Sequence, residues 1–344
     1  MVTLKDIAEE AHVSLMTVSN VVNGKYNKVS KEKVKEIQEI IKKRNYVQNA
    51  TARSLAKANS NIIAIILRSI HGENSLSSPH NAHLVGSIVR HIQELGYYAM
   101  INLVEDCDSI AKSIRTWNVQ AAIFLGMFDD EIEQIYALSS IPMVFIDSYS
   151  KIRQLSNVGI DDYKGGQLAA EYLIRKGHQK IAFVSPPNYE NGVVQHRLKG
   201  FTDVLDQHGL SLNAQHCFSV VSDADSEQIS QMVDQFMSIR DEITAVFVTS
   251  DGLAASLISG LHRYGLRIPA DLSVIGFDNM TISTQIFPPL TTIAQDLELK
   301  ARLAVDILNG RLKKTNASAE SRILDVRLIE RESVLDMKEK EGFA

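Results

Sequence analysis

The chain has 344 residues, of which 45% are apolar and 22% are charged. This composition is typical of a globular protein with an ample core, and the length predicts two or three domains. The longest unbroken apolar run, Ile62–Leu67, is far shorter than the roughly 20 residues that span a bilayer. The start lacks an apolar signal segment, and Cys107 and Cys217 form no CxxC. We therefore expect a cytoplasmic protein without a membrane span or a disulfide framework.

The formal net charge of −5 is distributed unevenly along the chain. Residues 1–60 hold 11 Lys and Arg against 6 Asp and Glu, a net charge of +5, so residues 61–344 carry −10. A small basic head on an acidic body indicates that the head binds a polyanion such as DNA. The alternative is a basic surface that only faces water.

The first 46 residues contain the signals of three short helices. Thr3, Ser14 and Ser30 are each placed to cap one of them at its N-terminus. The second helix is predicted over Leu15–Val22, where Asn23-Gly24 ends it. Two short helices joined by a tight turn and backed by a third predict a helix-turn-helix.

Six stretches of this region follow one another in a characteristic order: Thr3-Leu4-Lys5-Asp6-Ile7-Ala8, Val13-Ser14, Thr17-Val18-Ser19, Val22-Asn23-Gly24, Val29-Ser30 and Asn49-Ala50-Thr51-Ala52-Arg53-Ser54-Leu55-Ala56. Residues 3–60 thereby resemble the DNA-binding head of the LacI/GalR family of bacterial transcription regulators. The resemblance implies a repressor that binds double-stranded, near-palindromic operator DNA as a homodimer. It also implies DNA contacts from Thr3, Ser14, Leu15, Met16, Thr17, Ser19, Asn20, Asn23, Tyr26, Asn49, Ala52, Arg53 and Leu55.

In that family, the two residues after the cap of the second helix read bases in the major groove. Here they are Leu15 and Met16, whose apolar side chains suit the thymine methyl group. Asn20 can pair bidentately with adenine, and the hydroxyl groups of Ser14 and Thr17 suit phosphates at a helix N-terminus. The alternative for Leu15 and Met16 is ordinary core packing.

Residues 48–60 are expected to form a hinge between a head of residues 1–47 and the body. An isolated helix of this length is only marginally stable in water. We therefore expect the hinge helix to form only when a binding partner stabilises it. By resemblance, two hinge helices pair across the dimer and wedge Leu55 between base pairs in the minor groove. The alternative is a linker leucine packed on the body. Gln48 stands where the family usually has proline, which predicts a looser hinge.

From residue 61 onward, short apolar runs alternate with helical stretches. This alternation predicts βαβ units and parallel sheets, and their number predicts two Rossmann-like, doubly wound subdomains. The runs predicted as strands are Ile62–Leu67, Ala99–Val104, Ala121–Leu125, Met143–Ile146, Ile181–Val184, Ala245–Val248 and Ser273–Ile275. The fold class is therefore an α/β body behind an all-α head. We expect residues 61–160 with 291–322 in one subdomain and residues 161–290 with 323–344 in the other.

The family resemblance continues through the body, which resembles a periplasmic sugar-binding protein that closes on its ligand. It rests on Gly177-His178-Gln179-Lys180-Ile181-Ala182, Arg197-Leu198-Lys199-Gly200-Phe201, Ser250-Asp251-Gly252-Leu253-Ala254, Ile268-Pro269-Ala270-Asp271-Leu272-Ser273-Val274-Ile275-Gly276-Phe277-Asp278 and Pro288-Pro289-Leu290-Thr291-Thr292-Ile293. The resemblance implies a small-molecule effector, a sugar or sugar derivative, bound between the two subdomains.

Polar residues follow the predicted strands at their carboxyl ends, where ligands of such sheets bind. Carboxylates and an arginine suit sugar hydroxyl groups. With the resemblance, this predicts effector contacts from Arg68, Ser69, His80, Asp147, Arg197, Ser250 and Asp278. For Asp251 we favour a role at the start of the following helix.

Arg68 and Ser69 follow the first strand, where the family more often has an acidic or apolar pair. An arginine there would suit a phosphate or carboxylate, so a phosphorylated sugar is one hypothesis, and a solvent-facing arginine is its alternative. His80 and His83 are interpreted as residues at a helix start, and we predict neither a metal nor a cofactor.

The sequence contains no GxGxxG, P-loop, GxSxG or HExxH motif, so we expect no enzyme. The alternatives are a carbohydrate-active enzyme that uses Asp147 and Asp278 as paired carboxylates, and a sugar-binding protein without regulatory function. The final residues, 334–344, do not sustain a heptad repeat, which favours a dimer over a tetramer. The sequence does not decide whether the effector induces or corepresses, because both would use one pocket.

Overall fold

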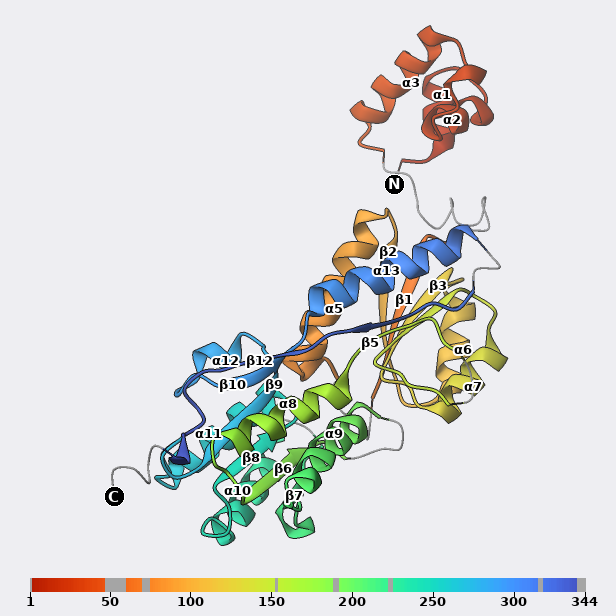
Figure 1. Cartoon of the computed structure of the whole chain (residues 1–344). Helices are drawn as coiled ribbons and strands as arrows, with labels where there is room; N and C mark the ends of the chain where they lie inside the picture. The colour runs from red at the N-terminus through yellow and green to blue at the C-terminus, as the bar shows by residue number, and fades with distance from the viewer. Residues whose placement is uncertain are drawn as a thin grey trace. The chain divides into compact units, whose positions relative to one another are not determined.

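The computed structural model describes residues 2–46, 60–69, 75–151, 154–187, 192–221, 225–314 and 318–338. The predicted contacts Asn49, Ala52, Arg53 and Leu55 of the hinge lie outside these residues. Contacts divide the chain into two units, Met1–Ser60 and Asn61–Ala344, each with its own core (Figure 1). Within the described part of the chain, no helix has the length and apolar character needed to cross a membrane.

The head consists of α1 (Leu4–Glu10), α2 (Leu15–Val22), the 3-10 turn η1 (Tyr26–Lys28) and α3 (Lys31–Lys43). Each predicted cap is present: Thr3 and Asp6 cap each other's backbone N–H groups, Ser14 accepts from the Thr17 N–H, and Ser30 accepts from the Lys33 N–H. Apolar side chains of the three helices form one small core. The helix-turn-helix prediction is confirmed.

The first sheet of the body has the strand order β11-β5-β4-β3-β1-β2, and all its pairings are parallel. Helices α5 and α13 cover one face, and α6 and α7 cover the other. The bounds are β1 (Ile62–Arg68), α5 (Pro79–Glu94), β2 (Tyr98–Val104), α6 (Cys107–Thr116), β3 (Ala121–Leu125), α7 (Asp129–Leu138), β4 (Met143–Ile146), β5 (Asn157–Ile160), α13 (Leu297–Lys313) and β11 (Ser321–Leu324), with the 3-10 turn η2 (Ser75–Ser77) before α5.

The second sheet has the order β12-β10-β9-β8-β6-β7, with β12 antiparallel to its neighbour. Helices α8 and α9 cover one face, and α10 and α11 cover the other. The bounds are α8 (Asp162–Arg175), β6 (Ile181–Ser185), α9 (Val193–Gln207), η3 (Ala214–His216), β7 (Cys217–Ser219), α10 (Ser226–Ser238), β8 (Ala245–Val248), α11 (Asp251–Arg263), β9 (Ser273–Asp278), α12 (Ile282–Gln285), β10 (Thr291–Ala294) and β12 (Arg327–Ile329).

The prediction of two doubly wound subdomains is confirmed, with two corrections to their boundaries. The chain passes between the sheets after β5, after β10 and after β11 (Figure 1). Residues 291–294, which we expected in the first subdomain, form β10 and pair with β9 in the second sheet. The next residues, 295 and 296, are therefore the segment that leads back to the first subdomain. The last passage follows Leu324, two residues later than expected.

Candidate functional site

The candidate recognition surface of the head is the exposed side of α2. Leu15 and Met16 are 53% and 69% exposed, whereas Val18 and Val21 of the same helix are buried in the core. The core-packing alternative for Leu15 and Met16 is therefore excluded. Two exposed apolar side chains in the first turn of a helix leave an apolar surface that a partner can cover.

Hydroxyl groups surround this apolar pair. The Ser14 and Thr17 hydroxyl groups lie 2.9 Å apart, and the Ser14 oxygen accepts from the Thr17 N–H at 3.1 Å. At the other end of α2, the Asn23 side-chain amide donates to the backbone oxygen of Ser19 at 2.7 Å. Tyr26 is half exposed in the following turn. The free N–H groups and positive dipole end of α2 favour an anion here, as a DNA phosphate would supply.

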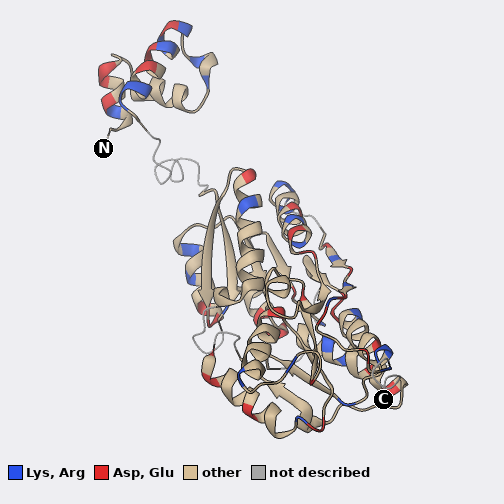
Figure 2. Cartoon of the chain, turned by 90° about the vertical axis from the view of Figure 1, so that its left-hand side faces the viewer, with Lys and Arg blue, Asp and Glu red and all other residues tan. Residues whose placement is uncertain are grey.

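Basic residues of the head lie close to this surface in the sequence. Lys25, Lys28, Lys31 and Lys35 are all exposed, and they lie in the turn after α2 and at the start of α3. Acidic residues are interspersed with them, as Figure 2 shows along the helices of the head. The head can thus place several positive charges against a polyanion.

The body contains a cleft of about 360 Å³ between its two subdomains. The carboxyl ends of β1, β3 and β4 lie on one side, and those of β6, β8 and β9 lie on the other. Six of the seven predicted effector contacts line it: Arg68, His80, Asp147, Arg197, Ser250 and Asp278. Ser69 does not line it: this residue is buried, and its N–H donates to Val104 at 2.8 Å.

Arg197 is a buried cation held from three sides. Its Nε donates to Asp162 at 2.8 Å, its Nη1 donates to the Thr249 backbone oxygen at 2.7 Å, and its guanidinium lies 3.6 Å from the ring centre of Phe277. Burial acts to lower the pKa of Arg197, but the negative charges of Asp162 and Asp278 outweigh it and raise that pKa. Arg197 therefore stays charged, with its orientation fixed in the cleft wall.

Two glycines set the position of the helix that carries Arg197. A Cβ atom on Gly166 of α8 would overlap the Arg197 backbone oxygen, and one on Gly200 of α9 would overlap the Tyr163 backbone oxygen. Helices α8 and α9 consequently cross at backbone contact. Only residues without a side chain allow this approach, and the approach places Arg197 over Phe277.

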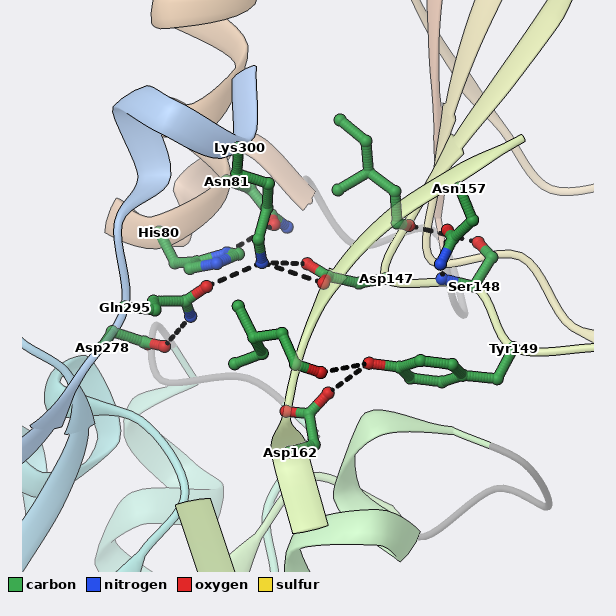
Figure 3. A network of polar contacts seen from close by, with 12 residues as sticks. His80, Asn81, Asp147, Ser148, Tyr149, Asn157, Asp162, Asp278, Gln295 and Lys300 are labelled. Carbon is green, nitrogen blue, oxygen red and sulfur yellow. Dashed lines mark hydrogen bonds and ion pairs between the residues drawn. The ribbon is translucent and has the colours of Figure 1, made fainter. Parts of the chain in front are cut away.

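A chain of polar contacts runs through the cleft wall from Asp147 to Asp278 (Figure 3). The Lys300 ammonium lies 2.8 Å from both carboxylate oxygens of Asp147 and 2.7 Å from Oε1 of Gln295. The Gln295 amide donates to Asp278 at 2.6 Å. Asp147 and Asp278 have φ values of 51° and 105°, which non-glycine residues rarely adopt and which are over-represented at functional sites.

A second chain starts two residues after Asp147. The Tyr149 hydroxyl lies 2.6 Å from a carboxylate oxygen of Asp162 and 3.0 Å from the Ile160 backbone oxygen, and its single hydrogen points between these two acceptors (Figure 3). Asp162 also accepts from Arg197. Burial raises the pKa of Asp162, and the charge of Arg197 opposes that rise. Burial also raises the pKa of Tyr149, so its hydroxyl stays protonated and serves as a donor.

Arg68, the residue behind the phosphate hypothesis, is engaged within the protein. Its Nε lies 2.9 Å from Glu131, and its guanidinium lies 4.6 Å from the ring centre of Phe128. Burial raises the pKa of Glu131, and the positive charge of Arg68 opposes this. The solvent-facing alternative for Arg68 is excluded, because the side chain lines the cleft and is only 28% exposed.

Asp251 lies behind the cleft wall. Ser250 caps α11, while Asp251 is fully buried and accepts from the Met280 N–H at 2.7 Å and from the Thr292 hydroxyl at 2.6 Å. The expectation that Asp251 caps the helix is wrong: Ser250 is the cap, and Asp251 ties α11 to β10 and to the loop after β9. Burial first, and the negative charge of Asp278 second, raise the pKa of Asp251 to about 8.

This shift gives stability a defined pH dependence. The folded-state pKa lies above the unfolded value of 3.8, so the folded protein binds the proton more tightly. The resulting stabilisation is complete below pH 4 and is lost as the pH rises through 8. It amounts to several kcal/mol, since each pKa unit corresponds to about 1.4 kcal/mol. Asp251→Asn, which mimics the protonated acid, should flatten the fall in unfolding free energy between pH 5 and 8.5.

Denaturant unfolding at several pH values measures this effect. The exposed helix cap Asp296 provides a control, because Asp296→Asn changes a carboxylate of the same type outside the buried site. Equal pH dependence in wild type and Asp251→Asn would show that Asp251 is ionised throughout.

Four residues that lie behind the lining of the cleft, and hold residues or segments of that lining in place, escape prediction from sequence. Lys300 and Asp162 lie on helices, Gln295 follows a strand that was not predicted, and Tyr149 lies beyond the residue that ends a predicted strand. One signal existed: Lys300 stands in the apolar stripe of α13 with Leu297, Ala301 and Ala304, where a lysine is unexpected unless it has a partner. Among the residues that the structure describes, no group of three or more His, Cys, Asp and Glu side chains is arranged to hold a metal.

Two families match the sequence of this chain. Residues 3–49 match bacterial regulatory proteins of the lacI family, and residues 170–334 match the periplasmic binding protein-like domain. The ribose operon repressor of Haemophilus influenzae is 30% identical to the chain, over 98% of this chain and 100% of the relative. The transcriptional repressor PurR of Photobacterium profundum is 28% identical over the same shares.

Solved structures match as well. The lac repressor dimer bound to operator and the anti-inducer ONPF superposes with a TM-score of 0.82 at 27% identity, covering 97% of this chain and 99% of that one. A LacI family regulator of Enterococcus faecium with bound ribose superposes with a TM-score of 0.69 at 25% identity, covering 80% of this chain and 99% of that one.

Proposed function

The chain belongs to the lacI family of bacterial regulatory proteins, and on this basis we propose that it is a transcription repressor whose head and body have separate roles. Its head reads operator DNA through Leu15, Met16 and Asn20, and its body binds a neutral sugar in the cleft between the subdomains. The observation that carries this proposal is the cleft itself, at whose walls both subdomains present charged groups in fixed positions. We place the protein in the cytoplasm, together with the DNA it regulates.

The exposed pair on α2 supports a specific way of reading DNA. Apolar side chains contact the thymine methyl group, whereas a glutamine in the same place pairs with adenine. Met16→Gln should therefore change the preferred base at one position of each operator half-site, with a discrimination of about 1–3 kcal/mol. Selection from a pool of randomised duplexes, for wild type and variant, measures the preference.

A charge variant serves as the control for this experiment. Lys28 is exposed in the turn after α2, and Lys28→Gln should weaken binding to all sequences alike and make binding less dependent on salt. If Met16→Gln recovers the same operator as wild type, Met16 does not read a base.

The charges of the cleft support a neutral ligand. The charged residues that line it, together with their partners, comprise three cations and four carboxylates: Arg68, Arg197 and Lys300 against Glu131, Asp147, Asp162 and Asp278. A phosphate would meet cations that already have carboxylate partners, in a region without excess positive charge. Sugar hydroxyl groups can instead donate to carboxylates and accept from arginine without adding charge. The proposed contacts are Arg68, His80, Asp147, Arg197, Ser250 and Asp278.

A thermal-shift screen of neutral pentoses, hexoses and disaccharides identifies the ligand, because a ligand that binds the folded state raises the melting temperature. Ribose and cellobiose belong in the panel, since solved structures of similar fold hold them. Calorimetry then compares the best sugar with its phosphate ester. Tighter binding of the neutral sugar supports the proposal, and tighter binding of the ester would return Arg68 to the role of a phosphate ligand.

An apolar sheet edge supports the dimer. Strand β2 ends the first sheet, and its Tyr98, Ile101 and Leu103 are each at least 39% exposed. An exposed edge strand with apolar side chains invites pairing or covering by another chain. A second copy that covers this edge would form the homodimer that a near-palindromic operator requires.

A further inference from the structure

Lys300 is a lysine with no exposed surface, placed on α13 of the first subdomain. An ammonium group has three N–H donors, and here all three have acceptors: the two oxygens of Asp147 and Oε1 of Gln295. A buried charge is costly unless it is paired and hydrogen-bonded. The position of Lys300 therefore depends on both of its partners.

One partner belongs to the first subdomain, and the other lies in the segment that connects the second subdomain to α13. Asp147 follows β4 of the first sheet, and Lys300 lies on a helix that packs against β3, β4 and β5 of that sheet. Gln295 follows β10 of the second sheet, and it donates to Asp278 at the end of the neighbouring β9. The 2.7 Å bond between Lys300 and Gln295, together with the bond from Gln295 to Asp278, thus links α13 of the first subdomain to the second sheet.

The chain of contacts also connects the two carboxylates proposed to bind the effector. Asp147 and Asp278 both line the cleft, whereas Lys300 and Gln295 do not. Asp278 and Gln295 line a second hollow of about 440 Å³, so this part of the chain of contacts forms a wall between two cavities. A hydroxyl group that binds either carboxylate in the cleft must share it with these contacts.

We propose that Lys300 is a positioning residue that latches the two subdomains together through Asp147 and Gln295, and so fixes the relative position of the two cleft carboxylates before any effector binds. An effector that bonds to Asp147 or Asp278 competes with the contacts of the latch and thereby changes how the two subdomains are held. The inference rests on the proposed function for its purpose, but its central claim concerns the effector-free protein.

Two variants separate a latch from a counter-ion that only stabilises the fold. Lys300→Met removes all three Lys300 contacts, leaves Asp147 without its cation, and keeps the bond from Gln295 to Asp278. Gln295→Leu removes only the link between the subdomains and leaves the Lys300–Asp147 ion pair in place. Lys313→Met, which changes an exposed lysine on the same helix, is the matched control.

Hydrogen exchange of the effector-free protein is the first readout. The Asp147 N–H donates to Val158 of the first sheet, and the Met280 N–H donates to Asp251 of the second. We expect Gln295→Leu and Lys300→Met to raise the exchange rate of both amides at least tenfold, and Lys313→Met to leave both unchanged. Adding Asp147→Asn to Lys300→Met should restore the melting temperature without restoring slow exchange, since the subdomain link is still missing.

Binding of effector-free protein to the operator recovered by selection is the second readout. We expect Gln295→Leu to change the operator dissociation constant at least fivefold and Lys313→Met to leave it unchanged. If Gln295→Leu has the same amide exchange rates and the same operator affinity as wild type, the latch proposal is wrong. This outcome decides the question even if Lys300→Met does not fold. If wild type binds no operator at all, the proposed function fails, and the exchange rates still decide the latch.

Discussion

Gly200→Ala is expected to lower the free energy of unfolding by about 3 kcal/mol or more. The added Cβ would overlap the Tyr163 backbone oxygen, and backbone cannot move aside as the end of a flexible side chain can. Helices α8 and α9 must therefore separate, and their separation moves Arg197 away from Asp162 and Phe277. The same variant should consequently lose effector affinity.

Denaturant unfolding and calorimetry with the sugar found by screening measure these two effects. Gly310→Ala is the matched control: Gly310 lies in α13, and a methyl group there would meet no atom within 4 Å. Alanine at that position should be neutral or stabilising by up to about 1 kcal/mol. If Gly200→Ala has the same free energy of unfolding as wild type, α8 and α9 can accommodate a Cβ atom where they cross.

Arg197→Met should produce the largest loss of effector binding, because it removes the cation that is oriented by Asp162, Thr249 and Phe277. Effector affinity should fall at least 100-fold. Stability should fall too, by about 3–5 kcal/mol, since the buried Asp162 carboxylate is left without its cation. Calorimetry and denaturant unfolding report the two losses separately.

A double variant distinguishes these two causes. Asp162→Asn removes the stranded carboxylate, so in the Arg197→Met background it should recover much of the stability and none of the effector affinity. Arg263→Met, which changes an exposed arginine on α11, serves as control for the loss of a positive charge. If Arg197→Met binds the effector as tightly as wild type, Arg197 does not contribute to effector binding.

The head could be predicted in detail because its determinants are local. Caps such as Ser14 and Ser30 act on backbone groups three residues away, and the apolar stripe of each helix repeats within the helix. The exposure of Leu15 and Met16 followed from the same logic, since Val18 and Val21 already fill the inward face.

The central strands of the body could be predicted because strands buried on both faces read as continuous apolar runs. The strands missed are β5, β7, β10, β11 and β12, of which all but β5 and β10 have exposed residues. Strand β10 begins with two buried threonines whose polar atoms bond to Ser333, Arg331 and Asp251, all distant in sequence. Only the folded structure reveals such partners, and β10 is where the predicted subdomain boundary was wrong.

The candidate site likewise contains residues that could be predicted from the sequence and residues that could not. Asp147 and Asp278 could be anticipated from topology, because the carboxyl ends of parallel strands meet at one edge of each sheet. Asp162 and Lys300 could not, because their importance comes from contacts with residues 35 and 153 positions away in the sequence. Ser69 adjoins the first strand as predicted, yet it is buried and does not line the cleft.

Occupancy of the cleft in the body should control binding of the head to DNA, and one measurement tests this coupling most directly. Fluorescence anisotropy of the selected operator is titrated with the full chain, with and without the sugar identified by thermal shift. We expect the sugar to change the operator dissociation constant at least about fivefold, within the usual range of allosteric coupling, in wild type but not in Arg197→Met. A sugar that binds the body and leaves operator affinity unchanged would contradict the coupling.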